Sequence, residues 1–399
     1  MTEWKECLIS DLGTVVGGAT PSTKDPSNYK DGKISWITPK DLSNYEDRYI
    51  SRGERNITEK GLNSCSAQLM PEHSVLFTSR APIGYVAIAA NEVCTNQGFK
   101  SVVPNENTDY LFLYYLLKHN KSKIEGLGSG TTFKEVSGST MRGIKVKVPT
   151  TLSAQKAIGE FLNSIDCKIE ENRRINKNLQ LQAQTLFAAW FETFEPFDGV
   201  VPDSWQQITL GDIAEIKTNS FNPQKNPDAL IEHYSIPAFD ENKYPVFEYG
   251  SGVKSNKYIL SNNSVMISKL NPDTKRVWRP LCLSDLAVSS TEFIIFEPYN
   301  PKYKDYVYSV IDSQGFTDWM CSHTTGSTNS RQRTTPATTL NYNLWMPDDE
   351  SIEKFLNAVT PMYDLISQNL HQNQELVSLR DSLLSKLMSG ELDVSEIDI

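Results

Sequence analysis

The stretch NQELVSLRDSLLSKLMSGEL, residues 373–392, has the pattern of the last turns of a long amphipathic helix. Gly390 provides the residue type that commonly ends a helix. The same apolar pattern extends back to residue 352, and its members include Ile352, Phe355, Val359, Met362, Ile366, Leu376, Leu383 and Leu387. Pro361 removes a hydrogen bond inside a regular helix, so we expect the helix to restart there with Thr360 as its N-cap.

A second helical pattern of this kind lies near the middle of the chain, and its members include Ile158, Phe161, Ile165, Ile175, Leu179, Leu186 and Trp190. Both patterns turn polar at mid-length, at Asn172 and Asn176 in one and at Asn369 and Asn373 in the other. A buried Asn in an apolar seam costs stability but fixes helix register. The matched interruptions favour an antiparallel intramolecular coiled coil. The alternative is that the four Asn side chains are exposed.

The residues before each helix repeat one another in order. The run 75–80 (VLFTSR) is similar to 265–269 (VMISK), so that Arg80 corresponds to Lys269, and 95–99 (TNQGF) is similar to 289–293 (SSTEF). This order predicts two similar units in tandem, each a strand-rich domain followed by a helix. The expected boundaries are 1–150, 151–197, 198–347, 348–390 and an acidic tail at 391–399. Truncation near residue 350 is then expected to leave a foldable first domain.

Both units are expected to be α+β, with strands before the long helix. Short runs rich in Val, Ile, Phe and Tyr, bounded by Gly, Pro, Asn and Ser, predict strands at 75–78, 85–89, 99–103, 143–148, 258–260, 265–270 and 293–296. A helix is expected at 108–119 with Thr108 as a candidate cap, and its counterpart near 303–314.

Composition is that of a globular protein with a formal net charge of -10. No apolar run is long enough to span a bilayer, and the polar start at residues 3–6 (EWKE) leads us to expect no signal peptide. The six cysteines are scattered without a C-x-x-C pair, which favours a reduced, cytoplasmic protein of a bacterium or archaeon. This net negative charge argues against a nucleic-acid-binding protein, but the argument depends on where the acidic residues lie along the chain.

The negative charge is confined to the second half of the chain. Residues 1–200 carry 23 basic and 23 acidic side chains, so residues 201–399 carry the remaining 16 and 26. Residues 118–147 hold seven Lys and Arg against two Glu, and residues 319–347 hold two Arg and no acid. Local basic surfaces of this kind are compatible with a phosphate backbone.

The run at 373–392 closely resembles the C-terminal region of type I restriction–modification specificity subunits. Residues 32–42 (GKISWITPKDL) look like the entry to their first target-recognition domain, and 128–134 (GSGTTFK) and 144–149 (IKVKVP) resemble its exit. The resemblance covers the whole chain, although the second domain lacks the WITPKD pattern.

This resemblance implies a non-catalytic subunit that reads a bipartite, asymmetric sequence in double-stranded DNA, one half per domain. The helices would space the domains and dock two methyltransferase subunits, and restriction subunits would complete the complex. S-adenosylmethionine, ATP and Mg²⁺ are expected only on those partners, with no cofactor or metal on this chain. The pairing and docking residues are expected to be Ile158, Phe161, Ile165, Leu179, Leu186, Met362, Ile366, Leu376, Leu383 and Leu387.

Three alternatives remain open. Asp228, Glu241 and Lys243 have the spacing of a metal-dependent nuclease site, with two carboxylates for Mg²⁺ and a lysine near the attacking water. A scaffold that does not bind DNA could use the same coiled coil. An antirestriction decoy would need clustered acids, whereas the acids here are dispersed.

Base reading in the major groove needs side chains with paired donors or acceptors, namely Arg or Lys for guanine and Asn or Gln for adenine. Hydroxyl groups and further cations would contact phosphates. The candidates in the first domain are Lys40, Ser79, Arg80, Asn96, Gln97, Thr131, Thr132 and Lys134. Those in the second are Lys269, Asn271, Lys275, Arg276, Arg279, Arg331, Gln332 and Arg333.

Overall fold

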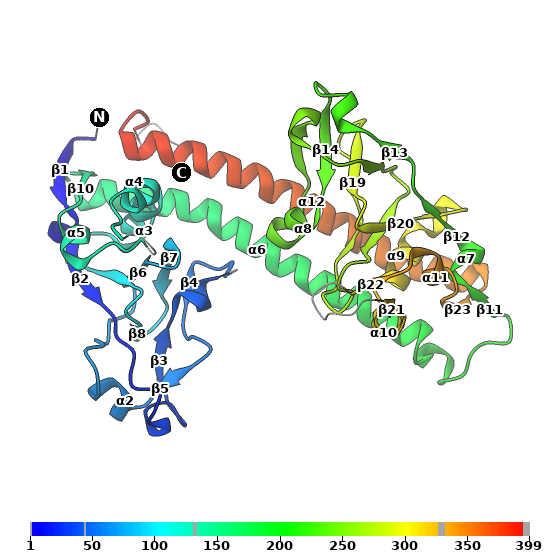
Figure 1. Cartoon of the computed structure of the whole chain (residues 1–399), viewed down its shortest axis with the longest axis horizontal. Coiled ribbons are helices and arrows are strands. Elements are labelled where there is room, and N and C mark those ends of the chain that lie inside the picture. The colour runs from blue at the N-terminus through cyan, green and yellow to red at the C-terminus, as the bar shows by residue number, and fades with distance from the viewer. Residues whose placement is uncertain (1, 44, 131–133, 326–331, 394–399) are drawn as a thin grey trace. The chain divides into compact units, whose positions relative to one another are not determined.

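The computed structural model describes residues 2–43, 45–130, 134–325 and 332–393. The chain divides into two compact units: unit 1 comprises Met1–Glu170 and Glu375–Ile399, and unit 2 comprises Glu171–Gln374. Each unit combines strands with helices (Figure 1), which confirms the expected α+β class. In the part of the chain that the structure describes, no helix is long and apolar enough to cross a membrane.

Unit 1 is built on a five-stranded sheet in the order β2-β9-β6-β7-β4. The central strand β6 is buried along its whole length because both of its faces are covered. Val75 and Phe77 point into one apolar core, whereas Leu76 points into another, as the alternation of a strand requires. The strands are β2 (Gly13–Gly17), β4 (Tyr49–Ile50), β6 (Val75–Ser79), β7 (Ile83–Ala89) and β9 (Lys100–Pro104).

Two smaller sheets complete unit 1. In one, β3 (Ile34–Ile37) pairs in parallel with β8 (Val93–Thr95) and antiparallel with β5 (Asn56–Ile57). In the other, β1 (Trp4–Leu8) pairs antiparallel with β10 (Lys145–Pro149). The helices of this unit are α1 (Ile9–Leu12), η1 (Pro26–Asn28), η2 (Pro39–Leu42), α2 (Glu59–Asn63), α3 (Tyr110–His119), α4 (Lys121–Gly126) and α5 (Gly138–Arg142).

Helix α3 confirms the helix expected at 108–119 but begins differently. Asp109, rather than Thr108, is the N-cap, and its carboxylate accepts a hydrogen bond of 2.8 Å from the backbone N–H of Phe112. Seven consecutive residues of α3, 111–117, are buried. An all-round apolar helix of this kind lies inside a core.

Unit 2 contains a four-stranded sheet, β12-β20-β17-β18, and a five-stranded sheet, β13-β16-β19-β14-β15. Strand β17 alternates as β6 does: Val265 and Ile267 belong to one core and Met266 to another. The strands are β12 (Ala214–Lys217), β13 (Ser220–Phe221), β14 (Leu230–Tyr234), β15 (Val246–Tyr249), β16 (Lys257–Ile259), β17 (Val265–Ser268), β18 (Val277–Trp278), β19 (Ala287–Ser290) and β20 (Phe293–Pro298).

The remaining elements of unit 2 flank these sheets. Strand β11 (Gln206–Thr209) pairs with β23 (Asn343–Met346), and β21 (Thr324–Thr325) pairs with β22 (Arg333–Thr334). The helices are α7 (Leu210–Ile213), η4 (Pro223–Lys225), α8 (Ile236–Asn242), η5 (Gly250–Gly252), η6 (Pro301–Tyr303), α9 (Lys304–Ile311), α10 (Gln314–Ser322) and α11 (Pro336–Thr339), and η3 (Glu195–Phe197) follows the central long helix.

Two long helices dominate the chain, α6 (Leu152–Phe191) and α12 (Asp349–Ser389). Helix α12 runs through Pro361 without interruption, so the expected restart at Thr360 is wrong. Val359 and Tyr363 are buried in the core of unit 2 on either side of the proline. Their packing holds the helix across the missing hydrogen bond. The expected stop is confirmed, because α12 ends before Gly390, whose φ is +77°.

The ten residues expected to pair the helices are all buried or half-buried. Several of them pack into the core of a unit. Ile158, Phe161, Leu383 and Leu387 belong to the core of unit 1 around β6 and α3, and Leu186, Met362 and Ile366 belong to that of unit 2. The C-terminal residues of α12 are therefore part of unit 1, and this packing argues against the expectation that truncation near residue 350 leaves a foldable first domain.

Candidate nucleic-acid interface

Backbone hydrogen bonds bring three loop segments of unit 1 together at the end of β6. The N–H of Ser79 donates to the carbonyl of Gly98 (2.7 Å), and the N–H of Val136 donates to the carbonyl of Ser79 (3.0 Å). A Cβ placed on Gly98 would lie 2.8 Å from Cγ of Pro39, so η2 also packs here. Four of the segments that carry predicted DNA-contacting residues therefore converge, although they are far apart in sequence.

Unit 2 has the same arrangement of bonds at the end of β17. The N–H of Lys269 donates to the carbonyl of Glu292 (2.9 Å), and the N–H of Thr334 donates to the carbonyl of Lys269 (3.1 Å). Ser79 thus occupies the position of Lys269, and the proposed correspondence of Arg80 with Lys269 is wrong by one residue. The bridge of Thr78 with Phe99 and the pairing of Ser268 with Phe293 agree with this register.

The predicted residues of unit 1 differ in their exposure. Lys40, Gln97 and Lys134 are exposed, and Asn96 and Arg80 are half-buried. Asn96 uses its side-chain oxygen to accept the N–H of Gly98 (2.9 Å), which shapes the loop between β8 and β9. Ser79 is fully buried and directs its hydroxyl to the Gly98 carbonyl, so it offers no group to a ligand. Thr131 and Thr132 lie outside the described residues.

The predicted residues of unit 2 that adjoin this site lie on two segments. Asn271 donates its backbone N–H to the carbonyl of Gln332 (2.9 Å), which joins the loop after β17 to the strand β22. The ammonium group of Lys269 donates a hydrogen bond to the backbone carbonyl of Thr291 (2.7 Å). Arg333 is exposed on the neighbouring strand. Arg331 lies outside the described residues.

Most of the predicted cations face a carboxylate, and burial separates them into two groups. The more accessible pairs are Lys40 with Glu54, Arg80 with Glu135 and Arg333 with Glu292, at 2.7, 3.2 and 3.1 Å. Exposed ion pairs contribute little to stability, so a phosphate can replace the carboxylate at low cost. The hydrogen bond with Glu54 raises the pKa of Lys40, and that with Glu292 raises the pKa of Arg333. Both side chains are therefore cationic at neutral pH.

In the second group the cation is mostly covered, because the side chains of Lys275, Arg276 and Arg279 are 27%, 14% and 15% exposed, although Asp240, the partner of Arg276, is 47% exposed. Lys275 lies 2.9 Å from Asp312, which is buried and also accepts the amide of Gln184 at 2.8 Å. Arg276 forms a two-point pair with Asp240 at 2.6 and 2.8 Å. Removing one partner of such pairs leaves a poorly solvated charge. The pairing of Lys275 with the buried Asp312 argues against its predicted role as a DNA contact.

Arg279 is the clearest correction. Its guanidinium lies 2.7 Å from Asp305 on α9 and 2.7 Å from Asp364 on α12. Burial would lower its pKa, but the two carboxylates outweigh burial and raise it. The side chain joins the end of β18 to α9 and α12 within unit 2, and this engagement argues against the predicted DNA contact.

Sequence reasoning missed the residues that support the loops of unit 1. Thr20 donates its hydroxyl to the side-chain oxygen of Gln97. Lys100 lies 3.6 Å from Glu135, the same carboxylate that holds Arg80. These partners come from distant segments, and no local spacing signals them.

No three His, Cys, Asp or Glu side chains group to hold a metal ion in the described ranges. Asp228 lies in the loop before β14, whereas Glu241 and Lys243 lie at the end of α8. The nuclease alternative therefore gains no support from their placement.

The chain is similar to known proteins along nearly its whole length. Residues 1–181 match the model of the type I restriction modification DNA specificity domain. The chain is 34% identical to the MjaIX specificity subunit of Methanocaldococcus jannaschii over 99% of this chain and 95% of that protein. It is 27% identical to the EcoR124I/EcoR124II specificity subunit of Escherichia coli over 41% of each chain.

A solved structure has a similar fold. The S subunit of a type I restriction–modification system from M. genitalium matches with a TM-score of 0.62 and 16% identity, over 97% of this chain and 96% of that one. This solved S subunit therefore shares the fold of the chain. The chain belongs to the family of type I restriction enzyme specificity subunits.

Proposed function

We propose that this chain is the non-catalytic recognition subunit of a type I restriction–modification complex. Each unit would read one half of a bipartite, asymmetric target in double-stranded DNA. Two methyltransferase subunits and the restriction subunits would be its protein partners and would carry S-adenosylmethionine, ATP and Mg²⁺. The observation that carries the proposal is the shared set of backbone bonds around Ser79 and Lys269, which gathers polar loops at one place in each unit. Membership of the specificity-subunit family supports the same function.

The proposed interface consists of the accessible residues on these loops. Base reading is assigned to amides and guanidinium groups, and phosphate contact to ammonium groups. In unit 1 the interface comprises Lys40, Arg80, Asn96, Gln97 and Lys134, and in unit 2 it comprises Lys269, Asn271, Gln332 and Arg333. Because the exposed cations exchange carboxylates for phosphates, binding should weaken as salt rises.

We also propose that the units are tandem repeats whose helices pair as an antiparallel coiled coil. The four Asn residues support this arrangement, because their side chains bond across the two helices. The amide of Asn172 donates to Asn373 (2.9 Å) and Gln372 (2.7 Å), and the amide of Asn369 donates to Asn176 (2.8 Å). Asn172 is fully buried. Polar pairs of this kind fix register.

Replacement of Asn172 tests that arrangement. Asn172→Leu should lower the free energy of unfolding by about 1–3 kcal/mol, because it leaves buried polar atoms of Asn373 with one partner fewer. The double variant Asn172→Leu/Asn373→Leu should recover much of that loss, since an apolar pair replaces a polar pair. Denaturant titrations of the four chains in a double-mutant cycle measure the coupling. Additive losses would argue against a paired seam.

Gln97 provides the sharpest test of base reading. Gln97→Ala should reduce discrimination between the target and a target with one changed base by about 1–3 kcal/mol. Competition binding of the assembled methyltransferase to the two DNAs measures this difference. Asn91→Ala is the matched control, because Asn91 is an exposed amide between β7 and β8 that bonds only its neighbour Glu92 in the hydrogen bonds described here. Equal discrimination by the wild type and Gln97→Ala would remove Gln97 from the interface.

The proposed function itself is tested by mapping adenine methylation across the host genome with and without this gene. A bipartite motif should lose methylation when the gene is deleted and regain it when the gene returns. An unchanged methylome would favour a scaffold that does not bind DNA. DNA cleavage by the isolated chain that is lost in Asp228→Ala would favour the nuclease alternative, and inhibition of a host restriction enzyme would favour a decoy.

A further inference from the structure

A single arginine joins the sheet of unit 1 to helix α6. Arg48 lies immediately before β4 and is 5% exposed. Its Nε lies 2.7 Å from Oε1 of Glu170 and its Nη2 lies 2.8 Å from Oε2. Such a two-point pair fixes both distance and orientation, whereas a lysine would supply only one point of charge.

The same guanidinium reaches further along α6. Nη1 donates to the side-chain oxygen of Asn163 (2.6 Å), and Nη2 donates to Sγ of Cys167 (3.3 Å). Asn163, Cys167 and Glu170 are spaced by four and three residues, so they lie on one face of the helix. Arg48 therefore contacts two successive turns of α6, and a rotation or slide of the helix would break several bonds at once.

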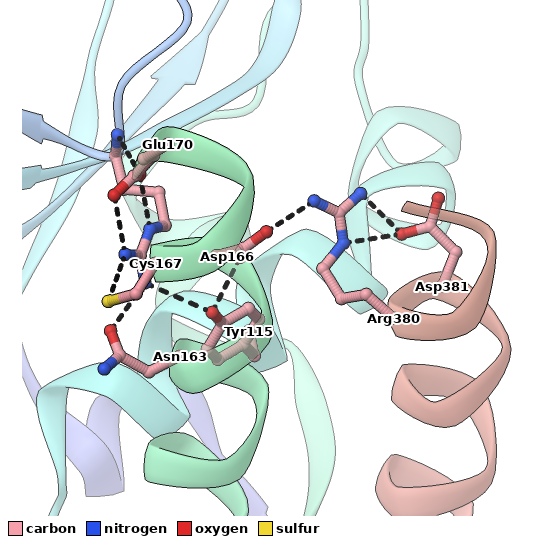
Figure 2. A network of polar contacts seen from close by, with 8 residues as sticks. Tyr115, Asn163, Asp166, Cys167, Glu170, Arg380 and Asp381 are labelled. Carbon is pink, nitrogen blue, oxygen red and sulfur yellow. Dashed lines mark hydrogen bonds and ion pairs between the residues drawn. The ribbon is translucent and has the colours of Figure 1, made fainter. Parts of the chain in front are cut away.

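The network continues through α3 to α12. Tyr115 of α3 donates its hydroxyl to Asp166 (2.7 Å), and Arg380 of α12 donates to the other oxygen of Asp166 (2.6 Å) (Figure 2). Burial would raise the pKa of Asp166, but the positive charges of Arg380 and Lys118, together with the hydrogen bonds from Arg380 and Tyr115, outweigh burial and lower it. Asp166 and Glu170 of α6 thus each pair with a guanidinium group from another element of unit 1.

Unit 2 has an arginine with the same type of connection. Arg279 follows β18 and bonds Asp364 of α12 through Nη2 (2.7 Å) and Ser367 through Nη1 (3.2 Å). Asp364 follows the run FLN at 355–357 at the same interval as Glu170 follows FLN at 161–163. The two carboxylates thus occupy matching positions on the two long helices.

The two arginines do not occupy matching positions in their sheets. Strand β4 pairs in parallel with β7, whereas β18 pairs antiparallel with β17. In each unit, nevertheless, an arginine forms an ion pair with the carboxylate at this position of the long helix, namely Glu170 of α6 or Asp364 of α12. A random surface pair would not recur at one helix position from unrelated segments, so the contact has a role beyond local charge balance.

We propose that Arg48 and Arg279 are positioning residues that fix the angle of each recognition domain on its helix and so restrict the half-site spacing that the protein accepts. This inference rests on the proposed function. Apolar burial is non-directional, whereas a multi-point arginine contact fixes both the distance and the orientation of the two groups that it joins. Loss of the contact should therefore widen the range of acceptable spacings before it abolishes recognition.

Methylation of DNAs with altered spacers tests this role. The complete methyltransferase, formed by this chain and its own modification subunits, is offered the natural target and targets with the spacer one base pair shorter or longer. In Arg48→Met and Arg279→Met, the preference of kcat/KM for the natural spacer should fall about tenfold. Glu170→Gln and Asp364→Asn retain the side-chain shape and should shift the preference in the same direction, which keeps the test valid if an arginine variant does not fold.

Arg174→Met is the matched control, because Arg174 pairs with Glu171 on α6 itself at 2.5 Å and is 79% exposed. Its spacer preference should equal that of the wild type. A purely structural role would lower methylation of all spacers by the same factor, and an unchanged preference in folded Arg48 and Glu170 variants would overturn the proposal. Failure of the wild-type complex to prefer any target would instead count against the proposed function.

Discussion

A chain that ends at Gln374 should lose the fold of unit 1, although every residue removed lies more than two hundred positions from β6. The core of unit 1 includes Leu384, Leu387 and Met388, of which Leu387 is fully buried. Burial of such side chains contributes about 1.5–3 kcal/mol each. Together they approach the total stability of a typical domain, which is about 5–15 kcal/mol. The truncation also removes Arg380 and leaves Asp166 buried without its cation.

Hydrogen exchange read by mass spectrometry measures this effect segment by segment. In the truncated chain, the peptides of β6 and α3 should exchange freely, whereas those of β17 and α9 should remain protected. Two single substitutions on α12 calibrate the result. Leu387→Ala should cost unit 1 about 2–5 kcal/mol, but Leu379→Ala should cost far less because Leu379 is 49% exposed. Protected β6 peptides in the truncated chain would refute the assignment of these residues to unit 1.

Phe355→Ala should be the most damaging single substitution in unit 2. Phe355 is 1% exposed, and its ring lies 4.9 Å from that of Phe191 and 6.4 Å from that of Tyr306. It joins α12, α6 and α9 in one aromatic cluster. Removing a buried phenyl ring typically costs about 3–5 kcal/mol, because the cavity closes only in part.

Thermal unfolding with hydrogen exchange checks this prediction. The transition of unit 2 should move to lower temperature, and the peptides of β17 should lose protection while those of β6 keep it. Phe247→Ala is the matched control, since Phe247 lies on β15 with 43% of its surface exposed. If Phe355→Ala and Phe247→Ala lowered the unfolding temperature of unit 2 equally, the prediction that the buried ring contributes more to stability would be wrong.

Much of the fold was predictable because local patterns determined it. The runs of Val, Ile and Phe predicted β6, β7, β9, β10, β16, β17 and β20 to within a few residues, and apolar spacing predicted both long helices. Pro361 was misjudged because tertiary packing of Val359 and Tyr363 overrides a local preference. The low helix propensity of a proline is weak evidence for a helix break where the residues on either side of it are buried.

The candidate site was less predictable, since its composition follows from tertiary partners. Residue type identified Gln97 and Arg333, which the structure leaves exposed. The same reasoning selected Arg279, and only the fold places Asp305 and Asp364 beside it. Arg48 carried no sequence signal, because nothing in its neighbourhood indicates that Glu170 will lie against it.

The composition of unit 1 from two distant segments has a consequence for synthesis. Residues 171–374 are continuous and contain the whole of unit 2, so this unit can complete its fold while the chain is still being made. Unit 1 begins to emerge first but lacks Leu384, Leu387 and Met388 until the last part of α12 has left the ribosome. The half of the protein that is translated first is therefore the half that matures last, and an incomplete chain carries an unfinished first unit.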